Sequence, residues 1–187
     1  MYPYIRLTKE LIRQKFLKKI SLSEIHTYYT ICWPIDLDPW WELNNGRTLT
    51  LYDLGRISYL LRSGLKNKIV KQGWRFTVAG SSIRYRKRVT IFNLLKVNTR
   101  FLGWDERFIY FQQTMWKKND PVSSILIRSA ITDKNGIVNS DRFIKIIGAE
   151  ARNIDLPDWA GNWSNACLLY TSPSPRDATL SRMPSSA

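Results

Sequence analysis

Residues 31–65, ICWPIDLDPWWELNNGRTLTLYDLGRISYLLRSGL, contain the change of pattern that decides the fold. Residues 25–33 are rich in β-branched and aromatic side chains, which predicts a strand. A turn bounded by Pro34 and Pro39 follows this strand. After the turn, apolar residues recur with helical spacing, at Leu49, Tyr52, Ile57, Leu60 and Leu61. The stretch therefore predicts a strand, a turn and one long helix.

The residue types at the two ends of this helix predict its boundaries. Asn44 or Asn45 suits the N-cap, because a side-chain oxygen there accepts hydrogen bonds from the free amides of the first turn. Gly64 suits the end of the helix, because glycine readily adopts the left-handed conformation found there. The helix is expected to end near Leu65.

Beyond the helix, the pattern favours antiparallel strands. Strand-like runs are expected over residues 74–82, 89–102, 107–116 and 122–132, separated by turns at 103–106, 117–121 and 133–136. In the second run the alternating apolar positions are Ile91, Leu95, Val97 and Phe101. Ser140 is expected to cap a short last helix over residues 141–147. One long helix wrapped by a single curved antiparallel sheet is an α+β architecture.

Composition excludes several classes of protein. The chain has 187 residues, 44% hydrophobic and 24% charged, which is the composition of a globular protein. No apolar run reaches the roughly 18 residues that a spanning helix needs, so an integral membrane protein is not expected. His26 is the single histidine, which argues against Ser-His-Asp and Cys-His mechanisms and against a metal site. No Gly-x-Ser-x-Gly motif occurs either, which leaves carboxylates as the groups for hydrolytic chemistry.

The two ends of the chain differ in character from the middle. Residues 5–20 predict a basic helix with Leu7, Leu11, Ile12 and Ile20 roughly on one side. This helix either packs on the edge of the domain or contacts an anionic membrane surface. The predicted organisation is an N-terminal helical extension over residues 1–23, one domain over residues 24–150, and a truncated C-terminal extension over residues 151–166.

Residues 167–187 are rich in proline and serine and show no hydrophobic period. They are either a disordered tail or, as we expect, a non-native segment that resembles the translation of a sequencing adapter of the kind found in metagenomic libraries. Removing Arg176, Arg182 and Asp177 with this segment lowers the net charge of +14 by only one. Cys32 would then be the one natural cysteine, which suits a reducing, cytoplasmic compartment.

Three short motifs lie in one order along the predicted domain. They are Asp36-x-Asp38-Pro39 in the turn, Asn44-Asn45-Gly46-Arg47 at the helix start with Asp53 and Arg56 inside the helix, and Gly103-Trp104-Asp105 between two strands. With these motifs, the chain resembles the hot-dog-fold acyl-CoA thioesterases, in particular the 4-hydroxybenzoyl-CoA thioesterase branch with Asn-Asn-x-Arg and Gly-Trp-Asp. The resemblance implies a hot-dog fold, an acyl-CoA substrate, no separate cofactor, and a homodimer or tetramer in which two subunits share the active site.

The resemblance also implies roles for residues near the helix start. A carboxylate at the position of Asp38 acts as general base or nucleophile, and the backbone amide near Asn45 polarises the thioester carbonyl. The residue chemistry agrees, because hydrolysis needs an activated nucleophile and a donor for the developing oxyanion. Asp36 and Glu42 are the alternative carboxylates, and local turn hydrogen bonding also explains an aspartate at these positions. The expected substrate contacts near this turn are Asn44, Arg47 and Trp41; relatives often carry glycine or histidine around Trp41 and Glu42.

The run RYRKR at residues 84–88 suggests a phosphate contact. Arg84, Arg86, Lys87 and Arg88 suit the pyrophosphate and 3′-phosphate of coenzyme A, or they form a solvated basic loop. The sequence therefore predicts an acyl-CoA thioesterase, with a non-catalytic acyl- or lipid-binding hot-dog protein as the alternative. A nucleic-acid-binding protein is a third and less favoured hypothesis, because the aromatic residues alternate as in a core.

Overall fold

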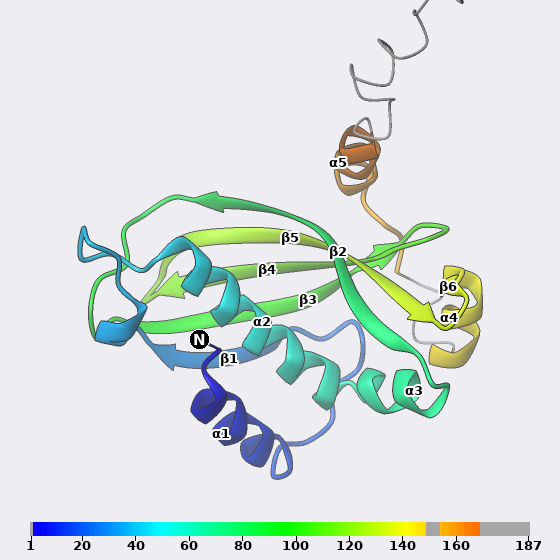
Figure 1. The fold of residues 1–187 in the computed structure, drawn as a ribbon, viewed down its shortest axis with the longest axis horizontal. Helices are drawn as coiled ribbons and strands as arrows, with labels where there is room; N and C mark the ends of the chain where they lie inside the picture. The colour runs from blue at the N-terminus through cyan, green and yellow to red at the C-terminus, as the bar shows by residue number, and fades with distance from the viewer. Residues whose placement is uncertain (1, 149–153, 169–187) are drawn as a thin grey trace, which may run out of the picture. The chain divides into compact units, whose positions relative to one another are not determined.

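Five antiparallel strands curl around one long helix in the computed structural model of this protein (Figure 1). The structure describes residues 2–148 and 154–168. The strand order in the sheet is β1-β3-β4-β5-β2, and a short sixth strand, β6, pairs with β5. The strands are β1 (His26–Ile31), β2 (Arg75–Tyr85), β3 (Leu94–Trp104), β4 (Ile109–Lys117), β5 (Asp120–Asp133) and β6 (Gly136–Ile137). The α+β architecture expected from the sequence is confirmed.

The long helix, α2 (Asn45–Arg62), begins and ends where its capping residues predict. The Asn44 side chain is the N-cap, and its oxygen accepts from the backbone amides of Gly46 at 2.9 Å and Arg47 at 3.2 Å. Gly64 follows the C-cap with a φ of 73°, the left-handed conformation that glycine adopts at little cost. The predicted N-cap at Asn44 and the stop at Gly64 are confirmed, although the helix ends at Arg62 rather than near Leu65, which begins the next helix.

A second helix, α3 (Leu65–Lys71), follows Gly64 directly, although the sequence pattern predicted mainly strands there. Two of its apolar residues, Leu65 and Ile69, are four positions apart and both are buried, so they lie on the same face of the helix, which packs against the domain. Two buried side chains are too few to give a periodic signal in the sequence, which is why the prediction missed this helix.

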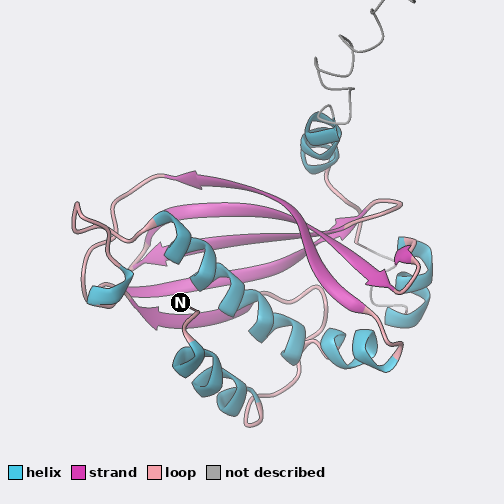
Figure 2. Cartoon of the chain, in the orientation of Figure 1, coloured by secondary structure: helices cyan, strands magenta, loops and turns pink. Residues whose placement is uncertain are grey.

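The core lies between α2 and the inner face of the sheet (Figure 2). Along β3 the odd-numbered residues Leu95, Val97, Thr99 and Phe101 are buried, as expected for a strand with one covered face. Gly55 lets α2 approach β3 closely, because a Cβ atom at this position would lie only 3.0 Å from Cγ1 of Val97. The helices α1 (Tyr4–Gln14) and α3 pack beside α2.

Three expectations about element boundaries are wrong. β3 starts at Leu94 rather than at residue 89, because Thr90 and Asn93 form a turn in which the Thr90 amide donates to the Asn93 side chain. The cap of α4 (Ser140–Ile147) is Asn139 rather than Ser140, since the Asn139 oxygen accepts from the amide of Asp141. The N-terminal helix ends at Gln14, well before residue 20.

The face of the N-terminal helix that packs against the domain also differs from the expectation. Leu7 packs against the core, whereas Ile12, expected on the same side, is 53% exposed. The described residues up to Leu156 belong to one compact unit, and the described residues from Pro157 belong to another, which contains α5 (Asp158–Leu168). Helix α4 is therefore not the last helix. Most of the predicted adapter-like segment, residues 169–187, lies outside the described residues.

Candidate functional site

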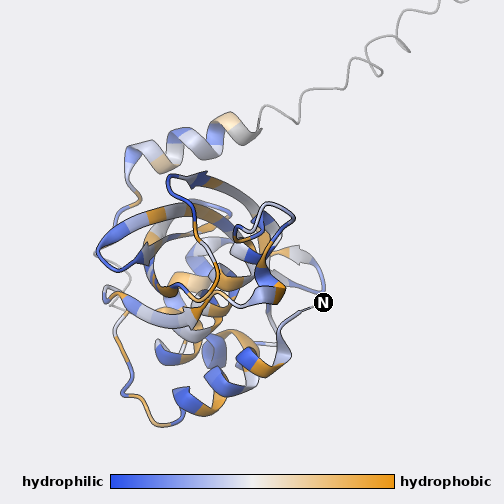
Figure 3. Ribbon diagram, turned by 90° about the vertical axis from the view of Figure 1, so that its left-hand side faces the viewer, coloured by the Kyte–Doolittle hydropathy of each residue, from blue (hydrophilic) through white to orange (hydrophobic). Residues whose placement is uncertain are grey.

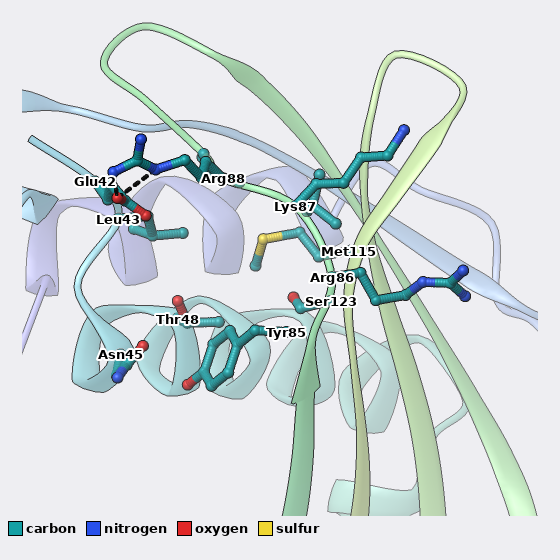
Figure 4. A pocket seen from close by; sticks show the side chains of 12 residues that line it. Glu42, Leu43, Asn45, Thr48, Tyr85, Arg86, Lys87, Arg88, Met115 and Ser123 are labelled. Carbon is teal, nitrogen blue, oxygen red and sulfur yellow. Dashed lines mark hydrogen bonds and ion pairs between the residues drawn. The ribbon is translucent and has the colours of Figure 1, made fainter.

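A pocket of about 330 Å³ lies at the N-terminal end of α2, where the sheet curls past the helix (Figure 4). Four segments of the chain line it: the loop before α2, the first turn of α2, the end of β2 with the loop that follows, and one end of β4 and β5. The lining residues that the sequence analysis singled out are Glu42, Asn45, Arg86, Lys87 and Arg88. The pocket thus combines a helix N-terminus, a carboxylate and consecutive cations.

The first turn of α2 leaves one backbone amide available at this pocket. The Asn44 side chain occupies the amides of Gly46 and Arg47, and the amide of Thr48 donates to the Asn44 carbonyl. Within the described residues, the remaining amide of the turn, that of Asn45, has no acceptor. A free amide at the positive end of the helix dipole favours a negatively charged oxygen.

Asp38 lies in the tight loop that leads into α2. Its Oδ1 atom accepts from the amides of Trp40 at 2.9 Å and Glu42 at 3.1 Å, and its own amide donates to the Glu42 carbonyl. The loop is closed further by a bridge between Leu37 and Leu43. Asp38 therefore shapes the loop with one oxygen. Its Oδ2 atom accepts no hydrogen bond from the described part of the chain.

The tip of this loop carries an unusual backbone conformation. Trp41 has a φ of 61°, in the left-handed region that side chains with a Cβ atom adopt at a cost. Its ring is exposed and lies outside the lining of the pocket. A glycine would adopt this conformation without strain.

Asp36 is buried, and both of its carboxylate oxygens interact with neighbouring residues. Its Oδ2 atom lies 2.5 Å from the Arg6 guanidinium and accepts from the amide of Trp33 at 2.9 Å. Arg47, the expected substrate contact, lies 3.9 Å from Oδ1 of Asp36. Asp36 and Arg47 thus meet each other and the N-terminal helix, and neither of them lines the pocket with Asn45.

Glu42 and Arg88 form an ion pair at the rim of the pocket (Figure 4). This hydrogen bond, together with the charges of Glu42 and Asp38, raises the pKa of Arg88. Lys87 pairs with Asp120 at 2.8 Å, with both side chains more than half exposed. In Figure 4 the side chains of Arg86 and Lys87 extend away from Asn45. Arg84 is exposed on β2 and does not line the pocket.

Several lining residues escaped the sequence analysis. The pocket wall also contains Thr48, Tyr85, Met115, Val122 and Ser123. Met115 and Ser123 face each other across β4 and β5, and Ser123 shares a hydrogen bond of 2.7 Å with the hydroxyl of Tyr52. Only Tyr85 carried a signal in the sequence, as the aromatic residue inside the basic run.

The single histidine and the buried cysteine take no part in this site. His26 contacts Arg62 at the last turn of α2, and the 18 residues of that helix span roughly 27 Å from the pocket. Cys32 is fully buried, and burial, with a smaller effect of Asp36, raises the pKa of its thiol to about 11. The thiol is therefore protonated at neutral pH. Carboxylates remain the groups with chemistry at this end of α2.

The Gly-Trp-Asp motif has a structural explanation. Gly103 has a φ of 140°, and a Cβ atom there would lie 2.7 Å from the Cα atom of Leu156. Asp105 accepts from the amides of Arg107 at 2.8 Å and Phe108 at 2.7 Å, which closes the turn between β3 and β4. The motif thus shapes a turn that lies outside the lining of the pocket.

Comparison with known proteins places this fold in a family. A family model described as the thioesterase-like superfamily matches residues 32–163. The chain belongs to this superfamily. The hot-dog fold expected from the sequence is therefore confirmed, and the resemblance to thioesterases is confirmed at the level of the superfamily.

Curated relatives of this superfamily member include two proteins named Protein THEM6. The Xenopus laevis protein is 35% identical over 108 residues, which cover 57% of this chain and 52% of that protein. The Drosophila melanogaster protein is 26% identical over 157 residues, which cover 82% of this chain and 79% of that protein. The chain thus matches about half the length of the Xenopus relative.

Solved structures show the same fold at low sequence identity. The probable thioesterase YbaW from Escherichia coli superposes with a TM-score of 0.63 and 17% identity, covering 67% of this chain and 98% of that one. The 1,4-dihydroxy-2-naphthoyl-CoA thioesterase Slr0204 from Synechocystis superposes with a TM-score of 0.59 and 13% identity, covering 72% of this chain and all of that one. None of the helices in residues 2–148 and 154–168 is long and apolar enough to cross a bilayer.

Proposed function

We propose that this thioesterase-like protein hydrolyses the thioester bond of an acyl-CoA in the pocket at the start of α2. One observation carries the proposal: Asn45, whose backbone amide has no acceptor among the described residues, lines the same pocket as Glu42 of the carboxylate-bearing loop and three consecutive cations. Hydrolysis of an acyl-CoA by a carboxylate mechanism uses these three elements, namely a donor for the oxyanion, a carboxylate to activate water and a site for the phosphates of the leaving group.

The reaction would proceed at the helix N-terminus. The thioester carbonyl oxygen accepts a hydrogen bond from the Asn45 amide, whose dipole stabilises the negative charge of the tetrahedral intermediate. The free Oδ2 atom of Asp38 takes a proton from water as the water oxygen bonds to the carbonyl carbon. Collapse of the intermediate breaks the C–S bond, and the departing coenzyme A thiolate receives the proton. Direct attack by Asp38 would give the same products through an anhydride that water then cleaves.

Glu42 is the competing carboxylate. It lines the pocket, which Asp38 does not, but its ion pair with Arg88 engages the carboxylate oxygen Oε1. Each carboxylate keeps one oxygen without a hydrogen-bond partner in the described part of the chain, and we favour Asp38 because it forms no ion pair there, whereas Glu42 holds Arg88. Glu42 would instead hold Arg88 over the pocket.

The cations give the site its selectivity for a phosphate-bearing substrate. Arg86 has no ion-pair partner among the described residues, and Lys87 and Arg88 have partners that are themselves accessible to solvent. Phosphate oxygens can replace such exposed carboxylates at modest cost, because exposed ion pairs contribute little. We assign the coenzyme A phosphates to Arg86, Lys87 and Arg88, with Arg84 on the preceding strand, β2.

The proposed enzyme would act as a homodimer. β2 is one of the two edge strands of the sheet, is 11 residues long, and has mostly exposed residues. No strand in the described part of the chain pairs with its outer edge, and long unpaired edges readily add another strand. Pairing of two β2 strands would join the sheets and would bring a second subunit to the end of β2, next to the pocket.

The test is the release of free thiol from a panel of acyl-CoAs by the purified chain. Asp38→Asn should lower kcat by at least about a hundredfold, the range for loss of a general base. Asp133→Asn is the matched control, because Asp133 also accepts a backbone amide in its own turn, but that turn joins β5 to β6 and is not the loop that leads into α2. Glu42→Gln separates the two carboxylates, since a larger loss for Glu42→Gln than for Asp38→Asn would transfer the role of base to Glu42. Calorimetric binding of acyl-CoA without any thiol release would refute hydrolysis and support the non-catalytic binding protein.

A further inference from the structure

The outer face of α1 carries apolar side chains that the fold does not use. Ile5 is 88% exposed, Ile12 is 53% exposed, and Phe16, in the turn that ends the helix, is 84% exposed. These positions are seven and four residues apart, so they form one stripe along the helix. A helix that only packs on its own domain turns its apolar stripe inward, as α1 does with Leu7. The second, outward stripe therefore needs another explanation.

Cations flank this stripe, and no exposed carboxylate accompanies them. Lys9 in the helix, and Lys15 and Lys19 after it, are exposed. Glu10 is the single acidic residue between residues 4 and 20, and it is buried, with its carboxylate bonded to Gln14 and Arg13. Burial of this one acid leaves an outer face with an apolar centre and cationic edges, which is typical of helices that lie in a membrane interface.

The apolar surface continues beyond α1 into a groove. This groove of about 780 Å³ runs between the first half of α1 and the edge strand β1. Its exposed apolar lining residues are Tyr4, Ile5, Tyr29, Trp33, Ile35 and Leu94. Aromatic side chains of this kind favour the boundary between headgroups and acyl chains. Figure 3, which views the molecule from the left-hand side of Figure 1, shows hydrophilic and hydrophobic residues interleaved along α1.

The groove and the helix are held as one rigid surface. Arg6 reaches from α1 to Asp36, with nitrogen–oxygen distances of 2.5 and 3.2 Å, and also donates to the carbonyl of Ile31. Tyr2 donates to Asp53 of α2 at 2.7 Å. These bonds fix the orientation of α1, so the exposure of its outer stripe is a property of the folded domain.

We propose that the outer face of α1 and the adjoining groove form a docking surface for an anionic phospholipid bilayer. Ile5, Ile12 and Phe16 enter the boundary between headgroups and acyl chains, and the flanking lysines pair with the anionic headgroups. Charge argues against a second copy of the chain as the occupant. Two subunits with a net charge of +14 each would bring their lysine-rich faces together, and lysine is depleted in protein interfaces. This surface is distinct from the pocket proposed for catalysis and does not depend on it.

The test is flotation of the full chain with phosphatidylcholine vesicles prepared with and without phosphatidylserine. We expect partition onto the vesicles that contain phosphatidylserine and a steep decrease as salt is added. The double variant Ile5→Asp, Phe16→Asp should weaken this partition by roughly tenfold or more, since each side chain loses the gain from burial in the bilayer. Val70→Asp is the matched control, because Val70 is 62% exposed on α3, away from this face, and should leave partition unchanged.

A charge-reversal pair separates docking from general attraction between a basic protein and an anionic vesicle. Lys9→Glu with Lys15→Glu should abolish binding, whereas Lys66→Glu with Lys71→Glu on α3 should retain most of it, at the same net charge. Equal losses in the two pairs would overturn the proposal.

Two further results would also overturn the proposal. One is dissociation of a wild-type oligomer by Ile5→Asp, Phe16→Asp in sedimentation equilibrium, which would make the face a protein interface. The other is saturable binding of monomeric short-chain phosphatidylserine without binding to vesicles, which would make the groove a site for a single lipid.

Discussion

Protonation of His26 should destabilise the folded protein between pH 6.5 and pH 4. His26 is fully buried at the start of β1, and its Nδ1 atom lies 3.0 Å from a guanidinium nitrogen of Arg62. The arginine can only donate, so the imidazole is neutral with Nδ1 as the acceptor. Burial first, then the charges of Arg62 and Arg13, lowers the pKa of His26 from 6.5 to about 4.

The sign and size of the effect follow from linkage. Below pH 6.5 the unfolded chain binds a proton at this histidine that the folded chain does not bind, so the free energy of unfolding falls as the pH falls. The loss is about 2 kcal/mol at pH 5 and about 3 kcal/mol once the pH is below 4, from 1.36 kcal/mol per unit of pKa difference. Above pH 6.5 the histidine contributes no pH dependence.

Urea unfolding followed by tryptophan fluorescence at pH 7.5 and pH 5 measures this loss. With a slope of about 2 kcal/mol per molar urea, the midpoint of wild type should fall by roughly 1 M from this cause. His26→Gln is the comparison, because glutamine keeps an acceptor for Arg62 and does not titrate. The chain has a single histidine, so the difference between the two proteins isolates one group and removes the contribution of carboxylates. Equal midpoint shifts in both proteins, or a histidine resonance that titrates near pH 6.5 in the folded state, would refute the reasoning.

Three further changes test the packing around the site. Asn44→Ala removes the acceptor for two amides of α2 and should lower the free energy of unfolding by about 1 kcal/mol in urea titrations; an unchanged value would show that solvent replaces the cap. Gly103→Ala forces a φ of 140° on alanine and places its Cβ atom against the backbone of Leu156, so a loss of about 1–3 kcal/mol is expected, and a gain in thermal stability would contradict it. Gly55→Leu crowds Val97 across the helix–sheet contact and should cost about 1–3 kcal/mol, whereas a neutral result would mean that β3 can move away from α2.

Local sequence signals determined the long helix and its ends. The cap at Asn44, the left-handed glycine at residue 64 and the apolar spacing between them act within a few residues, so they are visible in the sequence. The alternation along β3 and the turn signals between the later strands also act locally, and they were sufficient for the α+β class. The run at residues 89–93 misled the prediction because its apolar residues continue the alternation into a turn.

The candidate site needed the tertiary structure. Asp36 and Asp38 are equivalent in the sequence as turn aspartates, and only the fold brings Arg6, 30 residues away, to Asp36 and leaves an oxygen of Asp38 free. Met115 and Ser123 reach the pocket through the pairing of β4 with β5, which no local pattern specifies. Whether the apolar stripe on α1 is buried or exposed likewise depends on which face of α1 packs against α2. Capping and periodicity are short-range effects that the sequence alone determines, whereas ion pairs, pockets and exposed faces depend on contacts between distant segments, which only the folded chain decides.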